Sequence, residues 1–526
     1  MEPPYYTPVI IGVGDVVNRL TTLSETIEPL DIIFQAIELA LHDTGISDRH
    51  RQQLRSEIDS LDIVRTWTWP YPDLPTLLAA RLGVRPRHKS YSGNGGNQPA
   101  RIFDDAARRV ARGEAKVAIV AGGEALASLT AYAKAGRLPP PDWTKVEQSV
   151  DSIFSPTTQE FPEGHGAVHS IGAPIQVYPL YEHGFRAHRK QSLLDNNRES
   201  ARLYADFAKA AEQNMYSWNY GKSAKTAEEI GTVSKRNRMI CSPYPLLMNA
   251  FNTVDLAAAC LLTSTQYAEE LGVPRRKWVF PLGGAGTEDS ENFWERPNYH
   301  SCPALSASID AALVASGLKK EEIDLFDFYS CFPIVPKLAC AHLDLPITGG
   351  KKPITLLGGL TSFGGAGNNY ALHAITTTTR ALRSGKGTTA LVLANGGCLT
   401  YQHAVCFSTT APHETRRYPE KNPLQAVLVS KDVPPVIDGE EEVEGEAVIE
   451  TYTIDYSRAN TAVLGHIVCR SVKSGHRFLA NHGDEDTLRR LASGVEDPIG
   501  RRVVVFGDEK MKGRRLVVFR EQGARL

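Results

Sequence analysis

The sequence of 526 residues lacks three features that would place it in whole classes of protein. It has no uninterrupted apolar run of the roughly 18 residues that a membrane span needs, so we expect no membrane span. No charged segment followed by an apolar one opens it, so we expect no secretory signal. Its formal net charge of −2 provides no overall field that would favour nucleic acid or an anionic membrane.

Cysteine pairs with metal-binding spacing are also absent. The eight cysteines are scattered without any C-x-x-C pair, which argues against zinc and against a disulfide framework, and fits a reducing compartment. His165 and His169 lie four residues apart, but Gly164 and Gly166 oppose a helix there, so we expect no metal site. For His165, a substrate-facing role and ordinary polar packing both stay open.

Glycine is concentrated in two similar stretches. The turns at 92–98 and 362–370 each open a predicted helix, and each helix leads to an apolar strand that ends in two glycines. Shifting the first copy by 271 residues (368 − 97) lays Asn97 on Asn368. Bunched glycines let backbone approach a ligand and let N–H groups converge on one point. Each turn is therefore either a binding site or a helix start without a ligand.

The repeat predicts an α/β protein with two similar halves and a cleft between them. We place the halves at 1–265 and 266–415, with a loop insertion at about 125–234 where the hydrophobic period loosens. A linker at 416–446 is rich in proline and charge and includes the acidic run 440–442. These boundaries predict two packed halves followed by a separate C-terminal unit.

The C-terminal residues 447–526 change to strand periodicity, interrupted by one predicted helix at about 484–492. Several short strands with one helix suggest a small β-rich barrel resembling the OB-fold. The strands show no regular alternation of aromatic and basic residues, so we expect no nucleic-acid role. Packing against the core, or docking a protein partner, is the expected role.

Several segments resemble the thiolase superfamily, and especially its sterol-carrier-protein-type branch. With the extra C-terminal domain, the sequence is most similar to the thiolase-like proteins called type 1. The resemblance implies a duplicated five-layered α/β/α/β/α core whose loop insertion covers the substrate and grips CoA. The segments that carry it are Ser242-Pro243-Tyr244, Asp255–Ala259, Tyr329–Phe332, Gly358–Gly367 and the tract from Glu163 to Glu182.

The residues that thiolases use for chemistry are replaced. By motif, Gly96 stands for the nucleophilic cysteine, Gly365 for the histidine of the Gly-His-Pro turn, Tyr329 for the next catalytic Asn or His, and Ala394 for the acid/base cysteine. Covalent acyl transfer needs a thiolate and a base that activates it. We therefore expect classical thiolysis to be absent or weak.

Other residues near these turns could carry chemistry or bind a ligand. Cys331 is the candidate nucleophile, or else a buried packing residue, and Tyr329, His373 and Cys398 could transfer protons. A basic cluster from Arg186 to Lys190 could contact CoA phosphates or form a solvated face. Backbone N–H groups near the turns could hold an acyl carbonyl oxygen. The residues expected to contact a CoA thioester are Gly95, Gly96, Asn97, Gly364, Gly365, Asn368 and His165.

Three functions stay open. The resemblance implies an acyl-CoA acyltransferase of lipid metabolism, of the acetyl-CoA acetyltransferase type, that uses displaced residues, and we lean towards this enzyme. The alternatives are a non-catalytic protein that binds acyl-CoA or another acyl thioester, and a scaffold that docks a partner through its C-terminal domain. A CoA thioester would be the substrate or ligand, with no covalently bound cofactor. A homodimer is possible, although an added domain can block the edge through which thiolase cores usually dimerise.

The last three residues, Ala524-Arg525-Leu526, form a conservative variant of the Ser-Lys-Leu peroxisomal address. They predict recognition by the peroxisomal import receptor and a peroxisomal location. The cytoplasm is the alternative.

Overall fold

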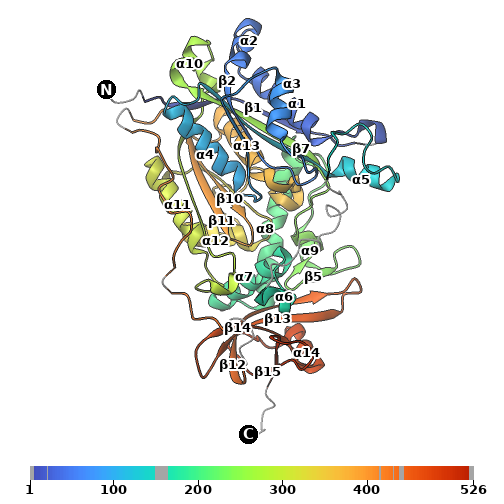
Figure 1. Cartoon of the computed structure of the whole chain (residues 1–526). Coiled ribbons are helices and arrows are strands. Elements are labelled where there is room, and N and C mark those ends of the chain that lie inside the picture. The colour runs from blue at the N-terminus through green and yellow to red at the C-terminus, as the bar shows by residue number, and fades with distance from the viewer. Residues whose placement is uncertain are drawn as a thin grey trace.

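The computed structural model comprises an α/β body and a smaller β-rich domain, which lie at the top and bottom of Figure 1. The acidic run 440–442, the start of the tract at Glu163 and the tripeptide 524–526 lie outside the described residues. No helix in the described part of the chain is long and apolar enough to cross a membrane. The described residues are 5–20, 22–147, 164–413, 416–430, 432–437 and 443–519.

The first half of the body contains a mixed sheet of strand order β1-β7-β4-β2-β3. β4 pairs in parallel with β2 and antiparallel with β7. All nine residues of β4 are buried, as expected for a strand covered on both faces. The strands are β1 (Pro8–Val17), β2 (Ile58–Ile63), β3 (His88–Tyr91), β4 (Val117–Ala125) and β7 (Asp255–Ser264), and the helices are α1 (Pro29–Asp43), α2 (Asp48–Ser56), α3 (Leu74–Leu82), α4 (Gln98–Ala111) and α10 (Thr265–Glu270).

The second half repeats this plan with a sheet of order β8-β11-β10-β9. β10 pairs in parallel with β9 and antiparallel with β11. Its strands are β8 (Phe280–Glu288), β9 (Leu325–Phe328), β10 (Thr389–Gly396) and β11 (Tyr401–Ser408), and its helices are α11 (Pro303–Ser316), α12 (Ile334–Leu343) and α13 (Tyr370–Arg383).

The helices that follow the two glycine turns, α4 and α13, form the middle layer of the body. α4 contacts β4 and β7 on one side and β8, β10 and β11 on the other, and α13 contacts β1, β7 and β10. α1 covers the outer face of the first sheet, whereas α11 and α12 cover that of the second. The predicted α/β/α/β/α layering is therefore confirmed, and it brings the two glycine turns together at the centre.

A helical region between β4 and β7 covers one end of the body. Its α7 packs against α12 of the second half and against β12 of the C-terminal domain. α7 therefore touches both parts of the molecule. The elements of the region are α5 (Leu126–Lys134), α6 (His165–Val168), α7 (Pro174–His188), α8 (Leu193–Gln213), α9 (Ala227–Gly231), β5 (Met239–Cys241) and β6 (Tyr244–Pro245).

The C-terminal domain is a small barrel. Its strands pair in the order β13-β14-β16-β15-β12, and an additional pairing of β12 with β13 closes the ring. Closure leaves no free edge within the ring, and β5 of the body extends the sheet beyond β12. Its elements are β12 (Gly445–Tyr456), β13 (Ala462–Ser471), β14 (Arg477–His482), α14 (Glu485–Ser493), β15 (Arg502–Gly507) and β16 (Arg515–Phe519).

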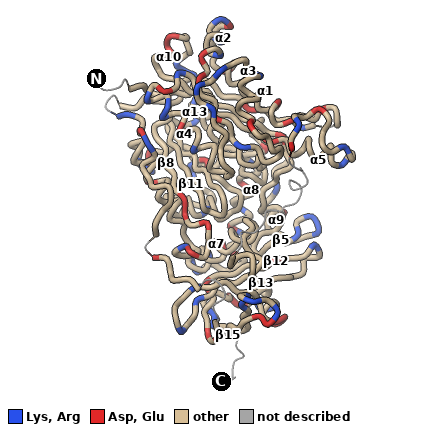
Figure 2. The backbone as a smooth tube through the Cα atoms, viewed as in Figure 1, with Lys and Arg blue, Asp and Glu red and all other residues tan. Residues whose placement is uncertain are grey.

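Buried arginines join the barrel to the body. Arg186 of α7 is 1% exposed and donates to both carboxylate oxygens of Asp497, at 2.6 and 2.9 Å. Arg477 of β14 is fully buried, and its guanidinium donates to Glu450 and to the carbonyl oxygens of Trp294 and Pro297. Acidic and basic residues are interspersed along the backbone in Figure 2. The barrel is thus held in one position by specific charged contacts.

Candidate functional site

The two glycine turns contact each other directly at the ends of α4 and α13. The Gly95 N–H donates to Asn368 Oδ1 at 3.0 Å, and Asn368 Nδ2 donates to the Arg65 carbonyl oxygen at 3.0 Å. Gly95 has a φ of 138°, a conformation that glycine adopts without strain. The predicted pairing of the two turns therefore places Gly95 and Asn368 in one site.

Tyr329 occupies the space next to Gly96. A Cβ added to Gly96 would collide with the Tyr329 hydroxyl oxygen, and it would lie 2.5 Å from the Asn395 carbonyl oxygen. Tyr329 follows β9, and its backbone N–H donates to the Leu393 carbonyl oxygen at 3.0 Å. Burial raises the pKa of the Tyr329 phenol, so it stays protonated. The position expected of a nucleophilic side chain thus holds a neutral phenol from another element.

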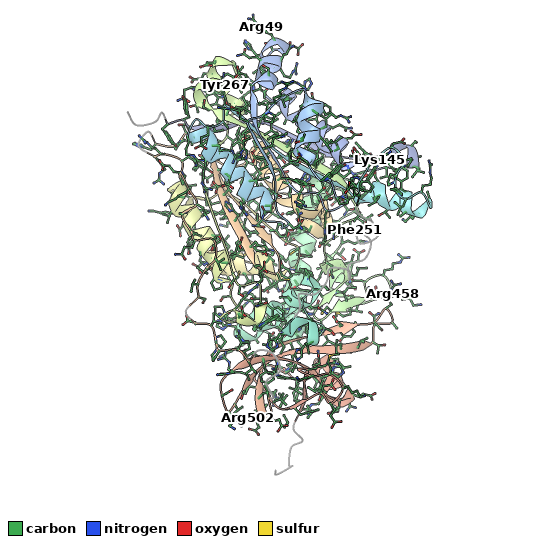
Figure 3. The ribbon with its side chains drawn as sticks, in the orientation of Figure 1. Arg49, Lys145, Phe251, Tyr267, Arg458 and Arg502 are labelled. Carbon is green, nitrogen blue, oxygen red and sulfur yellow. The ribbon has the colours of Figure 1, made fainter. Side chains whose placement is uncertain are left out.

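Gly365 is blocked in the same way by Asn252. A Cβ added to Gly365 would collide with Asn252 Oδ1. The Gly365 N–H donates to the Phe251 carbonyl oxygen at 2.7 Å. Phe251 itself is 43% exposed and lies at the outer edge of the body (Figure 3). The expectation that the Gly365 N–H is available to hold an acyl carbonyl oxygen is therefore wrong.

Gly96 and Asn97 present polar atoms that other residues leave unused. Within the described residues, the Gly96 N–H donates to no acceptor, and the buried Asn97 Oδ1 has no hydrogen-bond partner. Both lie against the end of β10, since a Cβ added to Gly396 would lie 3.0 Å from Gly96 N and 2.7 Å from Asn97 Oδ1. Buried polar atoms are rarely left unpaired, so this donor and this acceptor indicate a place for a bound molecule.

Cys331 belongs to a polar cluster beside this point. Asn395 Nδ2 donates to the Tyr178 hydroxyl at 2.8 Å and approaches Cys331 Sγ at 3.9 Å, and the Tyr178 hydroxyl donates to the Gly397 carbonyl oxygen at 2.8 Å. Cys331 is partly exposed, but burial still raises the pKa of its thiol to about 12. A nucleophilic thiol would need the opposite shift.

Cys398 and His373 occupy different surroundings. Cys398 approaches the Gly172 carbonyl oxygen at 3.8 Å, and burial raises the pKa of its thiol to about 11. His373 is fully buried in the middle layer, where its Nδ1 lies 2.6 Å from Asp15 Oδ1. Asp15 Oδ2 lies 2.6 Å from Arg380, so His373 belongs to a charged cluster of its own. That the sulfur of Cys398 or the imidazole of His373 transfers protons stays a prediction.

Glu124 is a functional candidate that sequence reasoning missed. Its carboxylate accepts hydrogen bonds from the backbone N–H groups of Trp67 and Thr68, at 2.6 and 2.7 Å. A Cβ added to Gly367 would collide with Glu124 Oε1, so the carboxyl lies against the second glycine turn. Burial raises its pKa to about 7, although the hydrogen bonds from Thr68 and Trp67 oppose this shift. The sequence pattern that could have identified this residue is a glutamate directly after the paired glycines of an apolar strand.

His165 lies between the body and the barrel rather than at the glycine turns. Its ring packs edge-on against Trp294 at 5.9 Å between centroids, and its Nδ1 lies 3.5 Å from a guanidinium nitrogen of Arg515. Neighbouring His169 accepts a hydrogen bond from the Arg515 backbone N–H at 3.1 Å, and burial lowers its pKa to about 3. These contacts favour polar packing for His165, and its substrate-facing role stays a prediction.

The predicted basic cluster on α7 is also largely engaged within the protein. Arg186 is paired with Asp497, and Arg189 donates to both carboxylate oxygens of Glu199, at 2.9 and 2.8 Å. Arg186 therefore joins α7 to the barrel and Arg189 joins the end of α7 to α8, so contact of this cluster with CoA phosphates stays a prediction. No group of three or more His, Cys, Asp or Glu side chains that could hold a metal occurs among the described residues.

Comparisons with known proteins agree with this architecture. The family described as the thiolase-like protein type 1 additional C-terminal domain matches residues 423–510. The crystal structure of a monomeric SCP2-thiolase-like protein type 1 from Mycobacterium smegmatis is 29% identical, with a TM-score of 0.77, and the match covers 98% of this chain and 99% of that one. The chain has a thiolase-like fold.

Two further structures share the fold at lower identity. The Ltp2–ChsH2(DUF35) aldolase has a TM-score of 0.55 at 17% identity, and the match covers 78% of this chain and 99% of that one. Human mitochondrial 3-ketoacyl-CoA thiolase in complex with CoA has a TM-score of 0.54 at 14% identity over 77% of this chain and 98% of that one. No curated protein sequence matches the chain. Since one fold carries different activities, the function of this thiolase-like protein must be argued from its site.

The comparisons bear on several expectations from the sequence. The resemblance to thiolase-like proteins of type 1 is confirmed by the C-terminal family and by the structure from M. smegmatis. The homodimer has no support, because that relative is described as monomeric. The OB-like character of the barrel, the peroxisomal address, and the roles of Cys331, Cys398 and Tyr329 stay predictions.

Proposed function

We propose that this thiolase-like protein binds an acyl-CoA thioester at the paired glycine turns and does not form a covalent acyl-enzyme. One observation carries the proposal: the Tyr329 phenol and the Asn252 amide occupy the space that side chains on Gly96 and Gly365 would need. A thiolase places a cysteine and a histidine at these two points. Here those groups are absent and their space is filled, whereas the surrounding backbone turns are kept.

The proposal that the site binds an acyl thioester rests on Gly96 and Asn97. A thioester carbonyl oxygen is an acceptor that suits the free Gly96 N–H beside α4, where the positive end of the helix dipole adds to the attraction. Asn97 Oδ1 is an acceptor that suits an amide N–H of the pantetheine arm. The shared fold with a thiolase solved in complex with CoA supports the choice of ligand.

The proposal that no covalent acyl-enzyme forms rests on Cys331. With a thiol pKa of about 12, only about one molecule in 10⁵ carries the thiolate at pH 7. Tyr178, its nearest phenol, also stays protonated because burial raises its pKa. No base activates the sulfur within this cluster, so the acyltransferase alternative lacks the step on which it depends.

Calorimetric titration with acetyl-CoA and longer acyl-CoA thioesters tests binding. Gly96→Ala and Asn97→Ala should each weaken binding about tenfold or more, because a buried hydrogen bond or the space for the ligand is lost. Gly507→Ala is the matched control, since nothing lies within 4 Å of its added Cβ. Thermal unfolding of each variant separates loss of binding from loss of fold. Unchanged binding in both folded variants would contradict the proposed site.

The acyltransferase is tested by intact-protein mass spectrometry after incubation with acyl-CoA. We expect the mass of the unmodified chain and no release of free CoA above the uncatalysed rate. An acyl adduct that disappears in Cys331→Ala but persists in Cys340→Ala would establish the covalent enzyme instead. Cys340 is a suitable control because it is buried on α12 outside the glycine turns.

A further inference from the structure

A cavity lies on the flank of the body, away from the glycine turns. It has a volume of about 620 Å³, within the range of small-molecule sites. It opens where α7 and α12 end and α11 begins, three helices that lie on the same flank in Figure 1. None of the glycine-turn residues lines it. A ligand in this cavity would therefore bind at a site separate from the proposed acyl-CoA site.

One wall of this cavity is apolar. Leu305 of α11, Leu338 of α12, and Leu345 and Ile347 after α12 all line it. Leu305 and Leu338 are 1% and 5% exposed, so they form part of the core behind the cavity rather than a loose surface patch. An apolar chain or ring placed here would lose contact with water and gain contact with these side chains.

The rest of the lining is polar and carries mostly basic groups. His188, Arg189, His300 and His342 line the cavity, and Glu199 is the one acidic residue among the described residues that line it. Arg189 holds Glu199 through two hydrogen bonds, and the buried Lys337 lies 3.3 Å from the same carboxylate. Glu199 is therefore already neutralised, and Lys337 is also paired with Glu182 at 2.5 Å, so any net positive charge of this lining comes from its histidines.

Among the polar residues that line the cavity, His188 and His300 form the most unusual contact. Their rings stack at 4.0 Å between centroids with only 3° between planes. Two protonated imidazoles this close would repel each other, and burial together with His188 lowers the pKa of His300. A bound anion would supply the missing counter-charge. The positive end of α11 also points here, whereas basic residues in the last turns of α7 and α12 compensate the negative ends.

We propose that this cavity binds an amphipathic carboxylate. Its head group lies between Arg189 and the stacked His188–His300 pair, and its apolar part lies against Leu305, Leu338 and Ile347. Arg189 is held flat over the Phe185 ring at 5.0 Å, and its bonds to Glu199 use only two of its five N–H donors. The remaining donors can bind a carboxylate oxygen.

Binding should strengthen as the pH falls. The charged and titratable groups that face the stacked pair are Arg189 directly after α7, Glu199 on α8 and His342 on α12, with Asp310 of α11 lying 2.7 Å from His342. Burial and His188 lower the pKa of His300, so its imidazole is neutral at pH 8 and gains its proton only as the pH falls below about 6.5. Protonation of His300 adds positive charge beside the carboxylate.

Isothermal titration with octanoate tests the proposal on the full chain. Octanoate should bind, whereas 1-octanol, which lacks the charge, and acetate, which lacks the chain, should bind at least about tenfold more weakly. The affinity for octanoate should rise about threefold or more from pH 7.5 to pH 5.5, because the pKa of His300 is lowered, and His300→Gln should remove that rise. No octanoate binding, or equal binding of octanol, would overturn the proposal.

Two tryptophan variants locate the binding site. Ala341→Trp on α12 places a large ring in the cavity at an exposed position, so it should weaken octanoate binding at least about tenfold without unfolding the protein. Val314→Trp, 78% exposed on α11 and outside the cavity, should change nothing. Saturating acetyl-CoA should not compete with octanoate. Equal binding by both variants, or competition by acetyl-CoA, would contradict a separate site, whatever the outcome at the glycine turns.

Discussion

The hydroxyl oxygen of Tyr329 lies where a side chain on Gly96 would have to be. The two residues come from different halves of the chain, and the phenol reaches Gly96 from the turn after β9. The glycine and the tyrosine are thus complementary: a larger residue at position 96 has no room while Tyr329 keeps this orientation. Under the proposed function, this pair, more than the absence of cysteine itself, accounts for the expected lack of classical thiolysis.

This complementarity predicts a coupled response to mutation. Gly96→Cys should destabilise the fold by about 1–3 kcal/mol, because overpacking forces neighbours to move. Adding Tyr329→Ala should recover part of that loss, but not all, since the Asn395 carbonyl oxygen also lies 2.5 Å from the new Cβ. A double-mutant cycle by urea unfolding measures the coupling. Simple additivity of the two effects would contradict the contact.

The raised pKa of Glu124 predicts that the free energy of unfolding depends on pH. Its pKa is about 7 in the folded state, above its ordinary value of about 4.3, so the folded chain holds the proton more tightly. This contribution to the free energy of unfolding is fully present below about pH 4.3 and is lost as the pH rises through about 7. The loss lowers the free energy of unfolding by up to about 3 kcal/mol. Glu124→Gln removes the titration, so its stability relative to wild type should improve from pH 5 to pH 8. Glu228→Gln, at an exposed position, should show no such trend.

Cys331 should react slowly with iodoacetamide at neutral pH. Burial raises its thiol pKa to about 12, so the rate of alkylation should keep rising up to the highest pH at which the fold survives. Peptide mapping after alkylation of the folded chain measures this rate for each cysteine. A rate that levels off near pH 7 would mean an activated thiolate and would favour the acyltransferase.

The contact between Arg186 and Asp497 should stabilise the attachment of the barrel. Asp497→Ala leaves the buried Arg186 guanidinium without its counter-charge, and should cost about 1–3 kcal/mol in urea unfolding, since Asp497 itself is partly exposed. Asp486→Ala is the control, because its pair with Arg489 is exposed and should contribute at most about 0.5 kcal/mol. Equal effects of the two variants would show that the ion pair between Arg186 and Asp497 does not stabilise the attachment of the barrel.

The C-terminal tripeptide predicts import into peroxisomes. A fluorescent protein fused to the N-terminus should give punctate signal in cells with peroxisomes, and deletion of residues 524–526 should make it diffuse. The intact fusion remaining diffuse in the cytosol would reject the address.

The layered fold could be predicted from the sequence, whereas most contacts of the site could not. The two glycine turns and the strands after them are local patterns, and their repetition predicts the paired halves. That Asn252 fills the space beside Gly365, or that Glu124 lies against Gly367, depends on side chains from distant segments meeting at one point. The surroundings of His165 could not be predicted for the same reason. Its partners Trp294 and Arg515 come from the second half and from the barrel.

The central claim is that acyl-CoA binds at the glycine turns without transferring its acyl group. Intact-protein mass spectrometry, run on the same acyl-CoA mixture as a calorimetric titration, tests it most directly. Saturable binding that Gly96→Ala weakens at least about tenfold, together with an unmodified chain mass and no release of free CoA, is the predicted result. A chain that gains the mass of one acyl group, and loses that gain in Cys331→Ala, would contradict the account.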